Sequence, residues 1–212
     1  MLIIIRIHSK GPIEEVWDEI IRQQEPIQRA FTDKCHLLYL TKRQGFHNEA
    51  SLFVDVLDHS ILGDLVVSHL AKIKEVENFI IHHLVNPKFY PLPRDTKEYS
   101  RFVINLKVEA PYLADVYKKL IDPNIPEGMK KVYFAFTFHS SSDCIQFSVL
   151  SKSADVLRKY VAEVIDHLPG VVRTTVIPIE RSKPFISYDT WQSFAGQNPS
   201  AITRSHLRGH TG

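Results

Sequence analysis

The sequence contains Phe53-Val-Asp-Val-Leu-Asp58, a stretch with helical spacing, and Lys74-Glu-Val-Glu-Asn-Phe-Ile-Ile81. It contains the same series again as Gln146-Phe-Ser-Val-Leu-Ser151, a helical stretch, and Pro169-Gly-Val-Val-Arg-Thr-Thr-Val176. Each copy places a strand before and a strand after an amphipathic segment. Self-similarity of this kind indicates a fold built from two related halves.

The segments on either side of each copy repeat in the same order. Isoleucines in residues 2–8 predict a strand, and residues 13–21 follow helical spacing. In the second half, Phe102, Ile104 and Leu106 alternate on one face of a strand, as expected for a half-buried sheet. Residues 156–168 carry the strongest amphipathic helical pattern, and Gly170 suits the left-handed position after that helix. Each half therefore predicts strand, helix, strand, strand, helix, strand.

This element order predicts an α+β protein made of two ferredoxin-like βαββαβ repeats. A half of fewer than ~100 residues has a thin core and leaves one sheet face uncovered. We therefore expect the two repeats to pack sheet to sheet as a dimeric αβ-barrel-like unit. The predicted boundaries are repeat 1 at 1–92, a linker at 93–99, repeat 2 at 100–186 and a C-terminal tail at 187–212.

Composition narrows the classes of partner. The 212 residues include 26 basic and 24 acidic side chains, and the net charge of +2 gives no general attraction to nucleic acid or anionic membranes. No apolar run approaches the ~18 residues of a membrane span, and no signal peptide pattern opens the chain. Two cysteines do not make a disulfide framework. We expect a cytoplasmic protein without direct contact to nucleic acid or membrane.

No metal or cofactor motif emerges from the sequence. The adjacent His82 and His83 point to opposite faces of a strand, so they do not chelate one ion together. His206 and His210 have the spacing of half a zinc finger, but no cysteine pair precedes them. A glycine-rich phosphate loop and a nucleophile elbow are both missing. The expectation is no metal and no cofactor.

The turn at residues 139–143 is the strongest ligand-binding candidate. His139, Ser141, Ser142 and Asp143 place an imidazole, two hydroxyls and a carboxylate in one hairpin, and Arg173 lies on the neighbouring sheet. These groups suit an amino or hydroxyl group of a small molecule. A polar hairpin turn also needs no ligand to explain it.

Alternation also predicts a polar sheet face opposite each helix-covered face. In the first half, Arg6 and Asp55 lie on this face and are expected to pair across neighbouring strands. A solvated sheet face explains the pattern, and so does a polar interior that holds water or a small molecule. In the second half the residues of this face include Asn105, Lys107, Tyr133, Thr137, His139, Gln146, Ser148, Arg173 and Thr175.

Residues 132–183 resemble the C-terminal effector-binding domain of the leucine-responsive regulator (Lrp/AsnC) family. The resemblance rests on Val132-Tyr-Phe-Ala-Phe136, the turn ending at Asp143, and Pro169-Gly-Val171 after a helix. Ser140 stands where the family has a glycine, and the sequence shows no helix-turn-helix. The resemblance implies a tandem effector domain that binds amino acids near the turn and acts through a homo-oligomer or a regulatory protein partner.

These observations favour a non-enzymatic regulatory protein that binds a small metabolite such as an amino acid. A rival from another class is an oxidoreductase or haem-binding enzyme of the dimeric αβ-barrel type. In that reading His8, Arg6, His139 and Arg173 line the barrel. A third alternative is a structural oligomerisation module.

Overall fold

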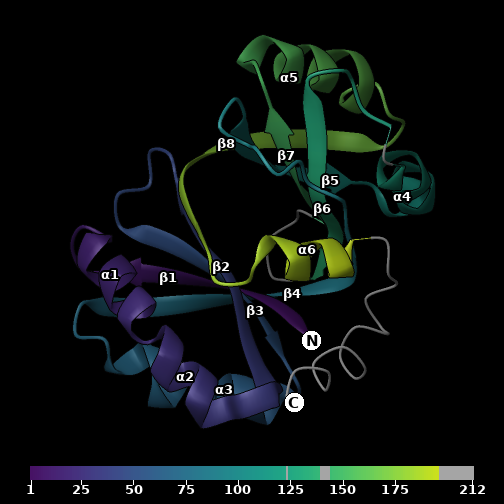
Figure 1. Ribbon diagram of the computed structural model, residues 1–212. Coiled ribbons are helices and arrows are strands. Elements are labelled where there is room, and N and C mark those ends of the chain that lie inside the picture. The colour runs from purple at the N-terminus through teal and green to yellow at the C-terminus, as the bar shows by residue number, and fades with distance from the viewer. Residues whose placement is uncertain (123, 139–143, 196–212) are drawn as a thin grey trace. The chain divides into compact units, whose positions relative to one another are not determined.

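The strands and helices belong to two compact units. Unit 1 comprises Met1–Leu84 and Glu180–Ser187, and unit 2 comprises Val85–Ile179 and the described residues from Tyr188 onward. Figure 1 shows the chain coloured from its N-terminus to its C-terminus. The computed structural model describes residues 1–122, 124–138 and 144–195.

Unit 1 is a four-stranded antiparallel sheet with helices on one face (Figure 1). Its strands pair in the order β4-β1-β3-β2. Its elements are β1 Leu2–Ser9, α1 Glu14–Arg22, α2 Gln24–Phe31, β2 Cys35–Arg43, β3 Glu49–Val56, α3 His59–Ser68 and β4 Val76–Phe89, whose last residues continue into unit 2.

The core of unit 1 follows the alternation of β1. Ile3, Ile5 and Ile7 are fully buried, and Trp17 and Ile20 of α1 belong to the same core cluster. Burial of each such side chain stabilises the fold by roughly 1.5–3 kcal/mol. Pro26 lies in the first turn of α2, where its missing N–H costs no hydrogen bond.

Unit 2 repeats the order of elements. Its strands pair as β8-β5-β7-β6, with antiparallel registers for β5–β7, β5–β8 and β6–β7. The core contains Ile104, Leu106 and Phe147 of the sheet together with Val116 of α4 and Leu157 of α5. Its elements are β5 Ser100–Val108, α4 Leu113–Ile121, β6 Met129–Phe138, β7 Ile145–Ser151, α5 Ala154–Tyr160, a π-helical turn Val161–Ile165, β8 Val171–Pro184 and α6 Tyr188–Phe194.

Two long strands join the sheets. Strand β4 pairs with β1 through residues of unit 1, and strand β8 pairs with β5 through residues of unit 2. The full hydrogen-bonded order is β1-β3-β2-β8-β5-β7-β6-β4 and closes on itself, which is the order of an eight-stranded barrel. The protein is therefore an α+β fold with a closed strand order.

Gly170 adopts the left-handed conformation that the sequence predicts, with φ of 80°. A Cβ atom at this position would lie 2.4 Å from the side chain of Tyr112. Gly170→Ala combines a left-handed alanine with a steric clash, so we expect a loss of about 2 kcal/mol in the free energy of unfolding, measured in urea.

Gly63→Ala is the matched control. Gly63 lies in α3, and a Cβ atom added there would meet nothing within 4 Å, so alanine should stabilise the helix by up to about 1 kcal/mol. Equal unfolding midpoints for the two variants would contradict the account of Gly170.

No helix in the described ranges is long and apolar enough to cross a membrane.

Candidate functional site

The structure describes one of the five predicted ligand-binding residues, Arg173. His139, Ser141, Ser142 and Asp143 lie outside the described residues. Arg173 lies on β8, opposite Lys107 of β5, and its side chain is exposed. The assignment of these five residues to a ligand site remains a prediction.

The polar face predicted for unit 2 forms an internal hydrogen-bond network. Tyr133 Oη donates to Gln146 Oε1 at 3.0 Å, and Gln146 Nε2 donates to Asn105 Oδ1 at 2.8 Å. Ser148 Oγ accepts from Arg101 Nε at 3.1 Å and donates to the carbonyl oxygen of Phe102 at 3.0 Å. These buried groups satisfy one another, so this part of the face needs no ligand to compensate them.

The corresponding face of unit 1 carries ionisable side chains around the buried Glu49, which we call the Glu49 cluster: Arg6, His8, Arg43 and Glu49. Arg43 Nη2 binds Glu49 Oε1 in an ion pair. Arg6 Nε lies 4.0 Å from Glu49 Oε1, and His8 Nε2 lies 3.8 Å from Glu49 Oε2. The predicted pair between Arg6 and Asp55 is wrong, because the register places Arg6 opposite Ser51.

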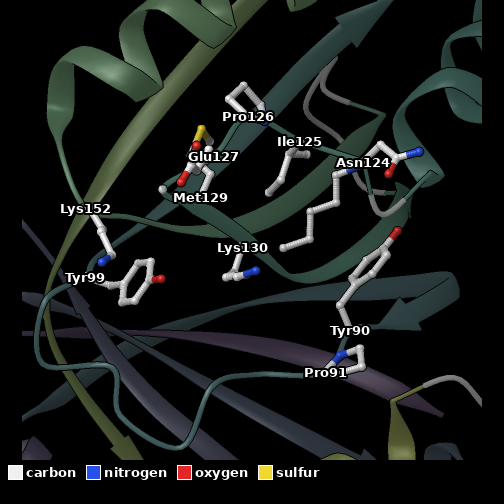
Figure 2. A pocket seen from close by; sticks show the side chains of 12 residues that line it. Tyr90, Pro91, Tyr99, Asn124, Ile125, Pro126, Glu127, Met129, Lys130 and Lys152 are labelled. Atoms are coloured by element: carbon white, nitrogen blue, oxygen red, sulfur yellow. The ribbon is translucent and has the colours of Figure 1, made fainter.

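The larger of two described cavities lies in unit 2 and has a volume of about 640 Å³ (Figure 2). It opens where β4 ends, where β6 begins and where β7 ends. Three lysines, two tyrosines and one carboxylate dominate its walls. The lining residues are Tyr90, Pro91, Tyr99, Asn124, Ile125, Pro126, Glu127, Gly128, Met129, Lys130, Lys131 and Lys152.

Lys131 is the most constrained side chain of this cavity. The residue is 3% exposed, and its ammonium donates hydrogen bonds to the carbonyl oxygens of Leu120 and Asp122. These carbonyls belong to the C-terminal end of α4, where a cation is favoured by the helix dipole. Burial lowers the pKa of Lys131 from 10.5 to about 8; Asp122 opposes the change and Lys88 adds to it.

Tyr90 completes the cap of α4. Its hydroxyl donates to the carbonyl oxygen of Ile121 at 2.6 Å, and burial raises the pKa of this phenol. Its backbone N–H donates to Val132 at 3.1 Å, and its carbonyl oxygen accepts from Trp191 Nε1 of α6 at 3.1 Å. Tyr90 is therefore held both at its hydroxyl group and at its backbone, and its ring forms an ordered wall of the cavity.

Lysine ammonium groups lie close to the rings of both tyrosines that line the cavity, Tyr90 and Tyr99. Lys88 Nζ and Lys131 Nζ lie 5.4 and 5.7 Å from the centroid of the Tyr90 ring. Lys152 Nζ lies 5.5 Å from the centroid of the Tyr99 ring and 2.8 Å from Glu98 Oε2. These distances fall within the range of cation–π attraction. Each wall thus combines a flat apolar surface with a positive charge.

The second described cavity lies in unit 1 and has a volume of about 350 Å³. Its one histidine, His69, packs against Phe31 with ring centroids 5.3 Å apart, and burial lowers the pKa of this imidazole. Charged side chains surround the rest of it. Its lining residues are Glu15, Glu19, Arg22, Gln23, His69, Lys72, Ile73, Lys74 and Glu75.

Side chains that bind metals do not gather in the described part of the chain. Among these residues, no group of three or more histidine, cysteine, aspartate or glutamate side chains is arranged to hold an ion. Cys35 is buried, and burial raises the pKa of its thiol to about 12, as for an inert core cysteine.

Sequence reasoning missed the larger cavity. Tyr90, Lys131 and Lys152 are far apart in the chain, and no motif joins them. One signal was available: Lys130 and Lys131 are adjacent at the start of β6, and neighbouring residues of a strand point to opposite faces, so one of the two lysines lies on the inner face. A lysine at such a position must reach a polar partner or open space.

Comparison with solved structures gives matches over most of the chain at low identity. A chlorite dismutase variant from Candidatus Nitrospira defluvii, in complex with cyanide, matches with a TM-score of 0.54 and 12% identity over 91% of this chain and 94% of its own. An anthrone oxidase-like protein gives 0.53 and 7% over 88% and 94%. A candidate monooxygenase from Lactobacillus acidophilus NCFM gives 0.52 and 10% over 86% and 95%.

These matches define the fold and nothing finer. No family model matches the chain, and no curated protein matches its sequence. The resemblance to Lrp/AsnC effector domains is wrong, because the structural neighbours are monooxygenase, anthrone oxidase and chlorite dismutase proteins. The motif Pro169-Gly-Val171, on which the resemblance partly rested, has a local structural cause. The chain passes from a helix to a strand there, and this turn requires a residue with positive φ, Gly170.

The regulatory function is overturned with the resemblance. The neighbours of this fold are named as enzymes, whereas the sequence prediction was a non-enzymatic regulatory protein that binds a small metabolite, with an enzyme of the dimeric αβ-barrel type as the rival. His8 and Arg6 of that rival reading do lie close together, but they serve the Glu49 cluster.

Proposed function

We propose that this protein is an oxidoreductase that oxidises a small organic molecule in the larger cavity of unit 2. The single observation that carries the proposal is Lys131, a buried amine with a pKa near 8 on the wall of a cavity of about 640 Å³. A general base works best when its pKa lies near the operating pH. The likeness to oxidase and monooxygenase folds supports oxidation as the reaction class.

The chemistry that suits this wall is removal of a proton from an acidic C–H or O–H group. Neutral Lys131 accepts the proton and leaves the substrate as an anion, and the resulting ammonium is held by the carbonyl oxygens of Leu120 and Asp122 at the wall of the cavity. An electron-rich anion of this kind can react with dioxygen. For an activated methylene, CH₂ and O₂ become C=O and H₂O, so no external reductant is required.

Haem does not fit either described cavity. A haem needs a protein side chain as an axial ligand to its iron, and it needs an apolar cavity for the porphyrin. The cavity of unit 2 has no histidine or cysteine among its lining residues, and the Tyr90 phenol is held protonated by burial and by its bond to Ile121. The cavity of unit 1 offers His69, but charged side chains surround it and do not suit the faces of a porphyrin.

We also propose that the two units are ferredoxin-like repeats. The order strand, helix, strand, strand, helix, strand occurs in both halves. The strand orders β4-β1-β3-β2 and β8-β5-β7-β6 are equivalent when each half is counted separately. A duplicated unit explains both observations together.

Oxygen consumption tests the proposed activity. The purified protein is mixed with anthrone and other compounds that carry an activated methylene, and oxygen uptake and product mass are followed. We expect a product that has gained one oxygen atom and lost two hydrogen atoms. Lys131→Met should lower the rate about 100-fold, because the base is removed.

Lys119→Met is the control, since Lys119 is exposed on α4 and does not line the cavity. No oxygen uptake with any compound, or equal rates for the Lys131 variant and the control, would refute the proposal. A Soret band with unit stoichiometry after addition of haem would refute the haem-free reading.

A further inference from the structure

We infer that the larger cavity of unit 2 selects a planar aromatic molecule with a single negative charge. The inference deepens the proposed function and rests on it for the identity of the site as a substrate site. Its own basis is the placement of lysines beside aromatic rings.

The first step is the balance of charge. Three lysines line the cavity against one carboxylate, that of Glu127. Lys152 shares its charge with Glu98, and Lys131 is bound to the carbonyl oxygens of α4. Lys130 is exposed and has no ion pair with a carboxylate among the described residues. It lies between Tyr99 and Tyr90 in Figure 2, so it is the cation most available to a ligand.

The second step is the shape of the walls. Tyr99 with Lys152 forms one side of the cavity, and Tyr90 with Pro91 forms another (Figure 2). Each ring has an ammonium within 6 Å of its centroid: Lys152 for Tyr99, and Lys88 and Lys131 for Tyr90. Tyr90 is buried and Tyr99 is partly exposed, so a ligand ring that packs against Tyr99 brings its substituents close to the ammonium of Lys152. A flat ring with an acidic substituent matches this pairing.

The third step is the amount of negative charge. Glu127 lines the cavity and Glu98 lies at its edge through Lys152. Both carboxylates would repel a ligand with two or more charges. Lysines also bind as point charges and lack the two-pronged geometry by which arginine holds a phosphate. A carboxylate, phenolate or enolate is therefore favoured over a phosphate ester.

Binding in the absence of oxygen tests this inference. The probes are 2-naphthoate and 2-naphthamide, which share a ring system and differ in charge, and their affinities are measured by isothermal titration calorimetry. We expect naphthoate to bind about tenfold more tightly, since a hydrogen bond to a charged partner is stronger than one to a neutral partner. Added salt should weaken naphthoate binding and leave naphthamide unchanged.

Two variants locate the effect. Lys130→Met should remove the preference for naphthoate, and because Lys130 is exposed the variant should fold normally. Lys119→Met, on the exposed side of α4, should keep the preference. Equal affinity for the two probes, or a preference that survives Lys130→Met, would overturn the inference.

The binding experiment and the oxygen-uptake experiment can fail independently of each other. Selective binding of naphthoate without oxygen uptake by any compound supports the ligand class and refutes the oxidoreductase. Oxygen uptake with neutral compounds alone, without selective binding, supports the oxidoreductase and overturns the ligand class.

Discussion

Glu49→Gln should lower the free energy of unfolding by about 3–5 kcal/mol, the typical cost of removing one partner from a buried ion pair. The Glu49 side chain is 5% exposed, and Arg43, its ion-pair partner, is 10% exposed. Arg6 approaches the same Oε1 atom as Arg43, and His8 approaches Oε2. Glutamine keeps the shape and removes the charge, so the buried Arg43 guanidinium and the half-buried Arg6 guanidinium lose their common counter-ion.

The matched control is Glu14→Gln. Glu14 also pairs with a buried cation, Lys42, at 2.6 Å, but its own side chain is 54% exposed and Lys42 has a second partner in Glu180. An exposed pair of this kind is worth less than about 1 kcal/mol. Urea denaturation followed by circular dichroism measures both variants.

A double variant sharpens the test. Arg43→Met in the Glu49→Gln background removes a cation that has lost its partner, so it should recover part of the stability. If Glu49→Gln and Glu14→Gln lose equal amounts, the Glu49 cluster is solvated and the account fails.

The alternation of apolar residues predicted the sheet faces well. Ile104, Leu106, Phe134 and Phe147 are fully buried in the core of unit 2, where a period of two residues places them. The side-chain period of a strand is a local property of the backbone, so it is readable from the sequence alone. Gly170 was predictable for the same reason, because its positive φ follows from the end of a helix.

Pairing across strands was not predictable in the same way. Arg6 and Asp55 lie on the same face, but Asp55 is opposite Leu2 and binds the amino group of Met1 at 3.0 Å. Register depends on hairpin geometry and on the packing of the whole sheet. Alternation predicts the sheet face on which a residue lies. It does not predict which residue lies opposite on the neighbouring strand.

The candidate cavity was not predictable from the sequence either, because it also depends on how the strands pair. A shift of register between Lys131 and Tyr133 changes the face of β6 in mid-strand. Such bulges have no reliable signature in one sequence. Tyr90 meets Lys131 only because β4 continues beyond unit 1 and pairs its end with β6. The site is a product of that long-range pairing.

The second large effect concerns pH. The contribution of Lys131 to the free energy of unfolding should rise by about 2–3 kcal/mol between pH 8 and pH 10. Burial lowers the pKa of its ammonium from 10.5 to about 8 in the folded protein. Within this window the unfolded chain binds the proton and the folded chain does not, so raising the pH favours the folded state. Below pH 8 both states are protonated, and the slope vanishes.

Cys35 and two buried tyrosines set the upper limit of the window. Burial raises the pKa of the Cys35 thiol from 9.0 to about 12, raises that of Tyr160 from 10 to about 12, and raises that of Tyr90 as well. The thiol above about pH 9 and the phenols above about pH 10 ionise first in the unfolded chain, so the free energy of unfolding falls. Stability should therefore reach its maximum between about pH 9 and pH 10, as measured by urea denaturation at each pH.

Lys131→Met isolates the lysine, since both proteins keep Cys35 and the tyrosines. Subtracting the two profiles should leave a rise from pH 8 that levels off by about pH 10.5, whereas Lys119→Met should reproduce the parent profile. A flat difference would mean that water reaches the Lys131 ammonium freely. The amine would then keep its ordinary basicity, and Lys131 would lose the property that qualifies it as the base of the proposed reaction.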